Sequence, residues 1–510
     1  MIQGEKPYQP AGIRPPAGIF GGIGLPRDEP GGIIAWFDPN NPSRLKIFRL
    51  SSGAPLLTCP GPQHPDNCAG RLMNTAPSQR PAIASDGPRT WLICILAAAL
   101  LARGLLLIAL AHSLSLQTSG YDVYAVHLLD GRGFTGSIDR SADSGLPPLY
   151  PFFLAGVYFL LGRNPISVAA VQIGIDLATV WLMYWIGKRV WNEKLGLLAA
   201  ALFAFYPYLI FQDLTVNDTG LFLCLLAAGI ALAYKARDSV QWRYALAVGA
   251  VIGLGALTKT FILAILPLLG FWWYRQVGLR RAATMSLAGG MMALAVIAPW
   301  IARNISVQKE FVLLSTNGGS NLHQGNNACV ADYLARGWDA QWVDCLGRPP
   351  EGLNEVGEDR WHTRQAIDYL RNHPADWPRL FGIKFLVLWS PAIMPSGLPP
   401  VIPAEESAVS LYQTAPFQIA RILHLLYFGP LLALGLAGLV WVWRDRLLIG
   451  PLVIVLAVFT LFYVVFHPST RYRSPADPFL FILSAYALLQ LWDRARGRLR
   501  RSRPDALQSG

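Results

Sequence analysis

Charged residues are scarce in this chain: Asp, Glu, Lys and Arg make up 15% of its 510 residues, whereas 53% are hydrophobic. The mean hydropathy of +0.36 is too high for an ordinary soluble protein. The six cysteines show no CxxC or CxxH spacing, which argues against a zinc site. No internal repeat is visible, although paired inverted repeats are common in transporters.

Long apolar runs are the main feature that the chain does have. They recur at nearly membrane-spanning length from Trp91 to Trp492, which predicts a polytopic membrane protein. The runs must be helices, because lipid cannot satisfy open backbone groups, so the expected fold class is all-α. We expect about ten spans, within a range of 9–13. They cover residues 92–113, 168–187, 195–212, 219–234, 243–257, 261–274, 284–301, 419–443, 447–466 and 476–492.

The basic residues orient these spans. The formal net charge is +12, but Lys and Arg cluster in short loops between the runs and in the tail, which is typical of cytoplasmic loops rather than of nucleic-acid binding. Both chain ends are therefore expected inside. Two short, proline-bounded apolar pieces, 149–161 and 380–394, fit better as interfacial helices on the outer face. The outer regions are then 114–167, 213–218, the turn near Lys259, 302–418 and 467–475.

Two aspartates, Asp122 and Asp218, lie just outside apolar runs on the outer side. A carboxylate at a membrane edge is costly and commonly serves chemistry or ion handling. Asp122 could act as a general base or hold a metal, or it could be a solvated charge on an interfacial helix. Asp218 could serve the same site, or could simply cap the helix that follows it.

Four cations are expected on the same side. Lys259 interrupts an apolar hairpin, so it must pair with an acid or bind an anion. Arg471 and Arg473 break the positive-inside rule, which suggests an anionic ligand such as a phosphate, or pairs with the outer aspartates. Arg303 follows Pro299-Trp300 at the outer end of another span.

The stretch after Arg303 is rich in Asn and Gly, which suits hydroxyl-rich or phosphate ligands, although a plain loop has the same composition. Its candidate binding residues are Asn317, Asn321, Asn326 and Asn327. Cys329 and Cys345 lie in the same outer region, where a disulfide between them is plausible.

Together these residues resemble the bacterial glycosyltransferase family 39 type, which includes protein mannosyltransferases and the lipid A aminoarabinose transferase. The resemblance covers roughly residues 92–495. Its markers are Tyr121-Asp122, Gly131-Arg132-Gly133-Phe134, Pro147-Pro148-Leu149-Tyr150-Pro151, Ala256-Leu257-Thr258-Lys259, Pro299-Trp300 with Arg303-Asn304, Ser315 to Gly319 with Asn321, Gly325-Asn326-Asn327, and Arg471-Tyr472-Arg473-Ser474-Pro475.

The resemblance implies a GT-C fold and a membrane glycosyltransferase, hexosyl or pentosyl and inverting, that uses a polyprenyl-phosphate-linked sugar at the outer face of a bacterial inner membrane. It implies that Asp122 is the catalytic carboxylate and that Asp218 is a second acidic position. Mg²⁺ or Mn²⁺ remains open as a cofactor, with Asp122 and Asp218 as ligands, because no DxD occurs in the outer loops. Lys259, Arg303, Arg471 and Arg473 would bind the donor phosphate. Tyr121, Tyr150, Asn317, Asn321, Asn326 and Asn327 would bind the lipid, glycan or protein acceptor.

The corresponding organisation is a disordered extension over 1–90, a catalytic membrane module over 91–301, an outer region over 302–418, the last membrane helices over 419–493 and a basic cytoplasmic tail over 494–510. With no signal peptide ahead of it, the first apolar run is expected to be an uncleaved anchor. The alternative function is a transporter or a flippase for lipid-linked glycans. The clustering of the candidate charges on one face favours the enzyme.

Overall fold

The computed structural model contains two units, Met1–Ala84 and Ser85–Gly510, which are described separately. It describes residues 33–38, 41–49, 87–116, 120–137, 142–397, 415–445 and 448–501. In the first unit, strands β1 (Ile33–Asp38) and β2 (Asn41–Arg49) pair as an antiparallel hairpin in which Trp36 lies opposite Lys46.

This hairpin differs from the expectation that 1–90 lacks regular structure. Its strands have 6 and 9 residues, too short for a sustained period, and Asp38-Pro39-Asn40 between them is a turn-forming sequence. The rest of the predicted disordered extension lies outside the described residues, apart from the start of the first long helix at Gly87.

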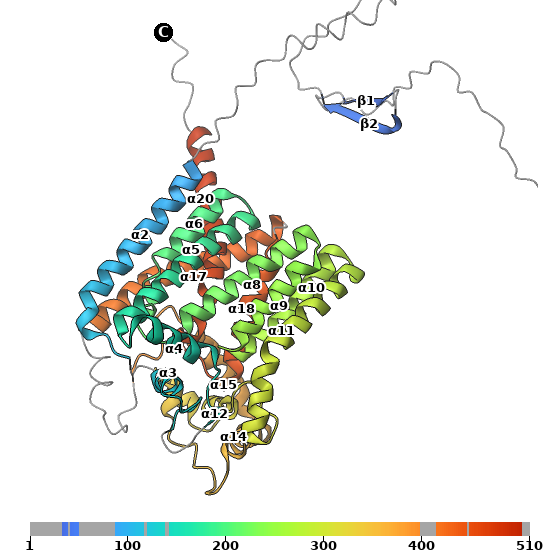
Figure 1. Ribbon diagram of the computed structural model, residues 1–510. Helices are drawn as coiled ribbons and strands as arrows, with labels where there is room; N and C mark the ends of the chain where they lie inside the picture. The colour runs from blue at the N-terminus through green and yellow to red at the C-terminus, as the bar shows by residue number, and fades with distance from the viewer. Residues whose placement is uncertain are drawn as a thin grey trace, which may run out of the picture. The chain divides into compact units, whose positions relative to one another are not determined.

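The second unit is a set of helices that run side by side, with shorter helices gathered at one end (Figure 1). The longer helices are α2 (Gly87–Leu110), α5 (Pro165–Val190), α8 (Thr219–Ser239), α9 (Trp242–Ala256), α11 (Leu279–Gln308), α14 (Glu355–Asn372), α17 (Ala415–Asp445), α18 (Gly450–Val465) and α20 (Asp477–Arg501). The shorter ones are α3 (Tyr121–Leu129), α4 (Leu149–Leu161), α6 (Glu193–Ala204), α7 (Pro207–Gln212), α10 (Ile265–Val277), α12 (Gly318–Gly325), α13 (Val330–Ala335), α15 (Trp377–Leu388) and α19 (Thr470–Arg473), with 3-10 turns η1 (Ala111–Ser113), η2 (Thr260–Ala264), η3 (Ala340–Trp342) and η4 (Pro374–Asp376).

Each of the ten predicted spans is occupied by a helix or a pair of helices, so the all-α polytopic prediction is confirmed. Six stretches of the described chain are long and apolar enough to cross a membrane: Gly87–Ser113, Pro165–Val190, Thr219–Ser239, Thr260–Val277, Leu279–Gln308 and Gln418–Val442. Helices α9 and α18 are apolar but shorter, and so is α4, which was expected to be interfacial.

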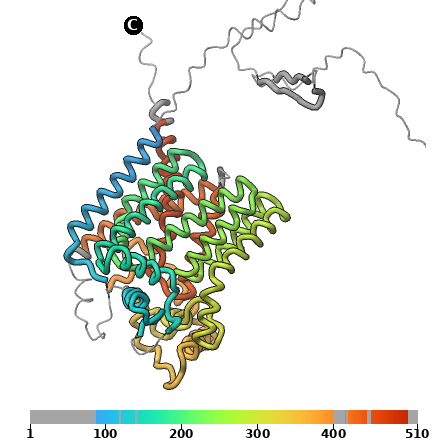
Figure 2. The backbone as a smooth tube through the Cα atoms, in the orientation of Figure 1, coloured from blue at the N-terminus to red at the C-terminus, as the bar shows by residue number. Residues whose placement is uncertain are grey.

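Small residues bring neighbouring helices into close contact. A Cβ at Gly249 of α9 would lie 2.0 Å from the carbonyl oxygen of Gly289 of α11, and one at Gly196 of α6 would lie 2.5 Å from that of Tyr184 of α5. Lipid offers no hydrophobic drive for helix association, so close backbone packing of this kind stabilises membrane bundles. The backbone tube follows the same pairs of helices along their length (Figure 2).

The site is formed by the ends of α8, α9 and α18 and the short segments next to them. Helices α3, α4, α12, α14 and α15 gather at this end of the bundle (Figure 1). The disulfide considered plausible from the sequence is present there and joins Cys329 to Cys345 in the region before α14.

Candidate active site

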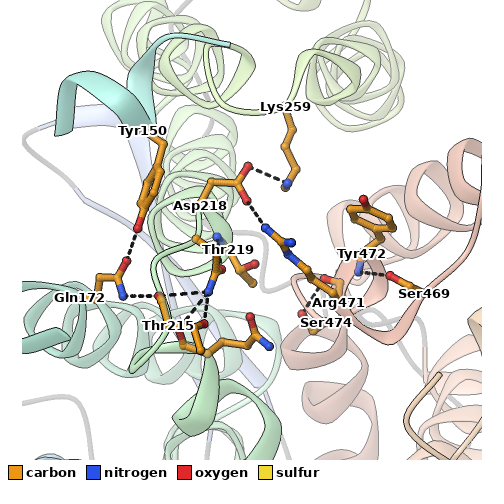
Figure 3. A network of polar contacts seen from close by, with 12 residues as sticks. Tyr150, Gln172, Thr215, Asp218, Thr219, Lys259, Ser469, Arg471, Tyr472 and Ser474 are labelled. Atoms are coloured by element: carbon orange, nitrogen blue, oxygen red, sulfur yellow. Dashed lines mark hydrogen bonds and ion pairs between the residues drawn. The ribbon is translucent and has the colours of Figure 1, made fainter. Parts of the chain in front are cut away.

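Asp218, Lys259 and Arg471 meet at one end of the bundle (Figure 3). Asp218 directly precedes α8, Lys259 lies between α9 and η2, and Arg471 belongs to α19. The Lys259 Nζ lies 2.7 Å from Asp218 Oδ2, and the Arg471 guanidinium lies 3.9 Å from Asp218 Oδ1. Arg471 lies more than 200 residues from the other two along the chain, yet the fold brings all three together.

Asp218 is not the helix cap that the alternative reading required. Its side chain makes no capping hydrogen bond, whereas Asn217 Oδ1 accepts a hydrogen bond from the Thr219 amide at 2.9 Å. An Asx-type contact of this kind satisfies a free N–H at the helix start. The Asp218 carboxylate is thereby left to face the two cations.

The cluster contains two cations and one carboxylate, so it has an excess positive charge. Asp218 is only 2% exposed. Burial lowers the pKa of Lys259, and the Asp218 carboxylate offsets this effect only in part.

Three buried atoms here have no hydrogen-bond partner: Asp218 Oδ1, Thr219 Oγ1 and Arg471 Nε. Buried polar groups in proteins are nearly always satisfied. Three unsatisfied atoms in one cluster therefore indicate a place for a polar ligand or ordered water.

Tyrosine rings surround the cluster. Tyr121 and Tyr150 pack edge to face with centroids 4.9 Å apart, and Tyr463 and Tyr472 stack at 5.1 Å. The Lys259 Nζ lies 5.9 Å from the Tyr472 ring centroid. Burial, together with the charge of Asp218, raises the pKa of Tyr121 well above its usual value, so its hydroxyl remains protonated at neutral pH. Such rings offer flat apolar faces and hydroxyl groups to a sugar or a lipid phosphate.

Gln172 of α5 connects Tyr150 to the segment that carries Asp218. The Tyr150 hydroxyl donates to Gln172 Oε1 at 2.6 Å, and Gln172 Nε2 donates to the carbonyls of Asp213 and Thr215 at 2.8 and 2.9 Å (Figure 3). The sequence analysis missed Gln172. Its only signal was a polar residue inside the apolar run 168–187.

Asp122, the carboxylate first expected to be catalytic, is bound by residues other than Lys259 and Arg471, and its catalytic role stays a prediction. Arg163 donates to its carboxylate through Nε at 3.0 Å and Nη2 at 2.6 Å, and the Tyr158 hydroxyl donates at 2.8 Å. Asp122 therefore has a complete set of local partners on α4 and the loop after it. The neighbouring residue, Tyr121, is the one that α3 presents to Asp218.

The structure does not bring Arg303 or Arg473 to Asp218. Arg473 is fully buried and donates through Nε to Asp477 at 2.9 Å and through Nη1 to the carbonyls of Leu388 and Ser390. Arg303 donates to the Phe134 carbonyl at 3.1 Å and lies 4.7 Å from the Trp300 ring centroid. Both guanidiniums hold protein segments together instead of facing the cluster.

The four asparagines mainly build their own loop. The Asn317 carbonyl accepts from Asn321 Nδ2 at 2.7 Å. Asn326 is fully buried and accepts from the Lys384 Nζ at 2.9 Å, while Asn327 Oδ1 accepts from the amides of two following residues. Their side-chain contacts therefore do not support the predicted acceptor contacts, and the plain-loop alternative explains them.

The two predicted metal ligands are each paired with a different cation. Asp122 pairs with Arg163, and Asp218 pairs with Lys259. Among the described residues, no group of three or more His, Cys, Asp or Glu side chains is placed to hold a metal ion. A carboxylate already neutralised by a cation is a poor fit for a divalent ion, so we assign no step to a metal.

A second buried charge cluster was also missed. Arg103 of α2 donates through Nε to Asp213 at 2.9 Å, through Nη2 to Asp176 and through Nη1 to the Ala204 carbonyl at 2.7 Å. The three charged side chains are at most 2% exposed. Arg103 and Asp176 each interrupt an apolar run, a signal that the sequence analysis did not use.

Comparison with known proteins gives one family match. Residues 146–302, less than half of the 510, match the family model of the dolichyl-phosphate-mannose-protein mannosyltransferases. The matched segment includes Asp218 and Lys259 but not Arg471. No curated protein matches the sequence.

Several solved structures are similar. The oligosaccharyltransferase AglB from Archaeoglobus fulgidus, with an inhibitory peptide and a dolichol-phosphate, is 12% identical with a TM-score of 0.47 over 83% of this chain and 52% of its own. The chain thus spans about half the length of that protein. ArnT from Cupriavidus metallidurans, bound to undecaprenyl phosphate, is 13% identical with a TM-score of 0.38 over 79% of this chain and 77% of its own. The family match over residues 146–302 and the helical membrane architecture confirm the resemblance to GT-C glycosyltransferases of the protein mannosyltransferase type.

Proposed function

We propose that this chain is an inverting membrane glycosyltransferase. It would transfer a sugar from a polyprenyl-phosphate-linked donor to a lipid, glycan or protein acceptor at the outer face of a bacterial inner membrane. The observation that carries the proposal is the Asp218–Lys259–Arg471 cluster, with two cations, one carboxylate and unsatisfied polar atoms. The family match over residues 146–302 supports it.

Lys259 and Arg471 would bind the donor phosphate. When the bond between the anomeric carbon and the phosphate oxygen breaks, its electron pair goes to that oxygen, and the polyprenyl phosphate leaves as an anion. Such a leaving group needs positive charge rather than an acid, and preorganised cations in a buried site stabilise it strongly. The excess positive charge of the cluster suits this role.

Asp218 is the carboxylate we propose for the acceptor, in place of Asp122. An acceptor hydroxyl would attack the anomeric carbon opposite the phosphate and give its proton to Asp218, which inverts the configuration. In the structure, Asp218 pairs with Lys259 at 2.7 Å. A donor phosphate would compete for Lys259 and so release Asp218 to act as a base.

The test is transfer from a radiolabelled polyprenyl-phosphate sugar in membranes that contain the full chain. We expect Asp218→Asn to reduce transfer by about 10²–10³-fold, the range for removing a preorganised catalytic group. Asp332→Asn, which removes an exposed aspartate paired with Arg379, is the matched control and should retain full transfer. Full transfer by Asp218→Asn would overturn the assignment.

Two further outcomes of this assay are informative. If Asp122→Asn retains full transfer, the role first expected of Asp122 is excluded; if it alone loses transfer, Asp122 and not Asp218 is the catalytic carboxylate. Uptake of the labelled lipid without any covalent change would instead support the transporter alternative. The membrane-buried Arg103–Asp176–Asp213 cluster is the one observation that favours that alternative.

A further inference from the structure

The end of the bundle remote from Asp218 has a shallow cavity of about 720 Å³. Its polar lining is Arg189, Arg237, Asp238, Gln276 and Arg281. Helix α8 begins next to Asp218 and ends at Ser239, and its 21 residues span about 32 Å at about 1.5 Å per residue. That length is close to the ~30 Å of a bilayer core. The cavity therefore lies at the membrane edge opposite the Asp218 cluster.

We propose that this cavity binds a phosphate-bearing anion, the headgroup of an anionic phospholipid from the leaflet opposite the Asp218 cluster. The proposal does not depend on the glycosyltransferase activity. It rests on the charge, geometry and surroundings of the cavity.

The charge of the lining is strongly unbalanced, since three guanidiniums accompany a single carboxylate. Asp238 orders two of them: Arg189 donates to both of its oxygens, and Arg237 Nη1 donates to Oδ1 at 3.0 Å. Arg237 Nη2 is also held by Gln276 Oε1 at 3.2 Å. A guanidinium has five N–H donors, so each arginine retains donors for a further anion.

Arg281 adds the third guanidinium from another helix, in the first turn of α11. No hydrogen bond or ion pair joins it to another residue of the described chain. Helix α11 starts after Gly278 without a side-chain cap, so its first amides also lack a side-chain acceptor. An uncapped helix start that carries an unpaired arginine is a favourable setting for phosphate oxygens.

The surroundings favour a lipid as the source of the phosphate. Phe271, Tyr274 and Leu279 lie a few residues from Gln276 and Arg281 and are exposed by 63%, 44% and 69%. Apolar side chains exposed at a membrane edge contact acyl chains, while the guanidiniums reach the headgroup. A free phosphate ion would make no use of these exposed apolar side chains.

The simpler explanation is a general attraction between basic loops and an anionic membrane. Substitutions at two adjacent arginines distinguish this explanation from a specific headgroup site. Arg281 lines the cavity, whereas its exposed neighbour Arg280 does not. The purified full chain would be mixed with phosphatidylglycerol or phosphatidylcholine in neutral detergent, and lipid retention measured by native mass spectrometry. We expect preferential retention of phosphatidylglycerol, weakened about tenfold by Arg281→Gln through loss of charge-assisted hydrogen bonds and unchanged in Arg280→Gln.

Equal retention of the two lipids, or equal losses in the two variants, would overturn the proposal. Arg237→Gln provides a second variant from another helix and should weaken retention in the same way. A competition experiment with inorganic phosphate identifies the source of the anion. If inorganic phosphate displaces the lipid, and if Arg281→Gln weakens the binding of inorganic phosphate, the cavity is a site for the free anion as well. If it does not displace the lipid, the site requires the lipid-borne phosphate.

Discussion

The Asp218 cluster and the Arg103 cluster are built from the same kinds of side chain but are completed differently. Asp218 faces two cations, and three atoms around it have no hydrogen-bond partner. Arg103 faces two carboxylates and two backbone carbonyls, and none of the three charged side chains is among the buried groups without a partner in the described chain. The comparison indicates that the Arg103 cluster holds helices together, whereas the Asp218 cluster is incomplete without a ligand.

Arg103→Gln gives the largest expected effect and tests the structural half of this comparison. It leaves Asp176 and Asp213 buried without a cation, which typically costs about 3–5 kcal/mol of stability. Thermal unfolding in detergent should show the loss. Arg379→Gln, which breaks a pair with Asp332 in which both side chains are exposed, should cost less than about 1 kcal/mol. A stable Arg103→Gln variant with lost transfer would instead give this cluster a functional role.

Lys259→Gln tests the other half of the comparison, that the Asp218 cluster binds a ligand. We expect transfer to fall by about 10²–10³-fold, because a cation aimed at the leaving phosphate is lost. The unfolding temperature should change little, because Asp218 keeps the Arg471 guanidinium nearby as a second cation. The control is Lys188→Gln, which breaks an exposed pair with Glu193. A parallel loss of stability and transfer would make Lys259 a structural residue.

The success of sequence analysis differs between the two clusters for a physical reason. Asp218, Lys259 and Arg471 stand in short segments at the ends of spans, where an unexpected charge is visible without a structure. Arg103 and Asp176 lie inside spans, so their partners depend on how helices rotate against each other, and a linear pattern does not determine this. The same limit explains Arg473, which points into the bundle only two residues from Arg471.

The helical architecture followed from the apolar runs, since lipid leaves the backbone no other choice. The direction in which each side chain points could not be predicted from the apolar runs. Asp122 and Tyr121 are neighbours on α3, yet Tyr121 faces Asp218 while Asp122 faces Arg163. A helix turns by about 100° per residue, so a prediction that is correct for the segment can be wrong for the residue.

Gln172→Leu should reduce transfer less than Lys259→Gln does, because Gln172 acts through Tyr150 and the segment before Asp218. The change removes the acceptor of the Tyr150 hydroxyl and the donor to two carbonyls. We expect transfer to fall about tenfold, mainly in kcat, when assayed well below the unfolding temperature. Tyr150→Phe removes only one of these hydrogen bonds and should fall less. The reverse order would show that Tyr150 contacts the substrate directly.

The smallest expected effect is a gradual change of stability with pH, caused by Lys384. This residue is a buried cation with no carboxylate partner among the described residues. Its Nζ donates to Asn326 Oδ1 at 2.9 Å and to the Val465 carbonyl at 3.1 Å. Burial lowers the pKa of Lys384 to about 7 in the folded chain, against about 10.4 for an unfolded lysine. Between these values the unfolded chain binds the extra proton, so stability should rise as the pH increases from about 7 toward 10.

Lys384→Met should remove most of this pH dependence, because methionine fills a similar volume without a charge to bury. Unfolding temperatures measured at pH 7 and pH 9 should converge in this variant, while Lys194→Met, at an exposed lysine, should keep the wild-type difference. If Lys384→Met retains the full pH dependence, another group is responsible. In that case the two neutral hydrogen-bond acceptors of the Lys384 ammonium are sufficient to keep it charged in the folded chain, without the carboxylate partners that Arg103 has.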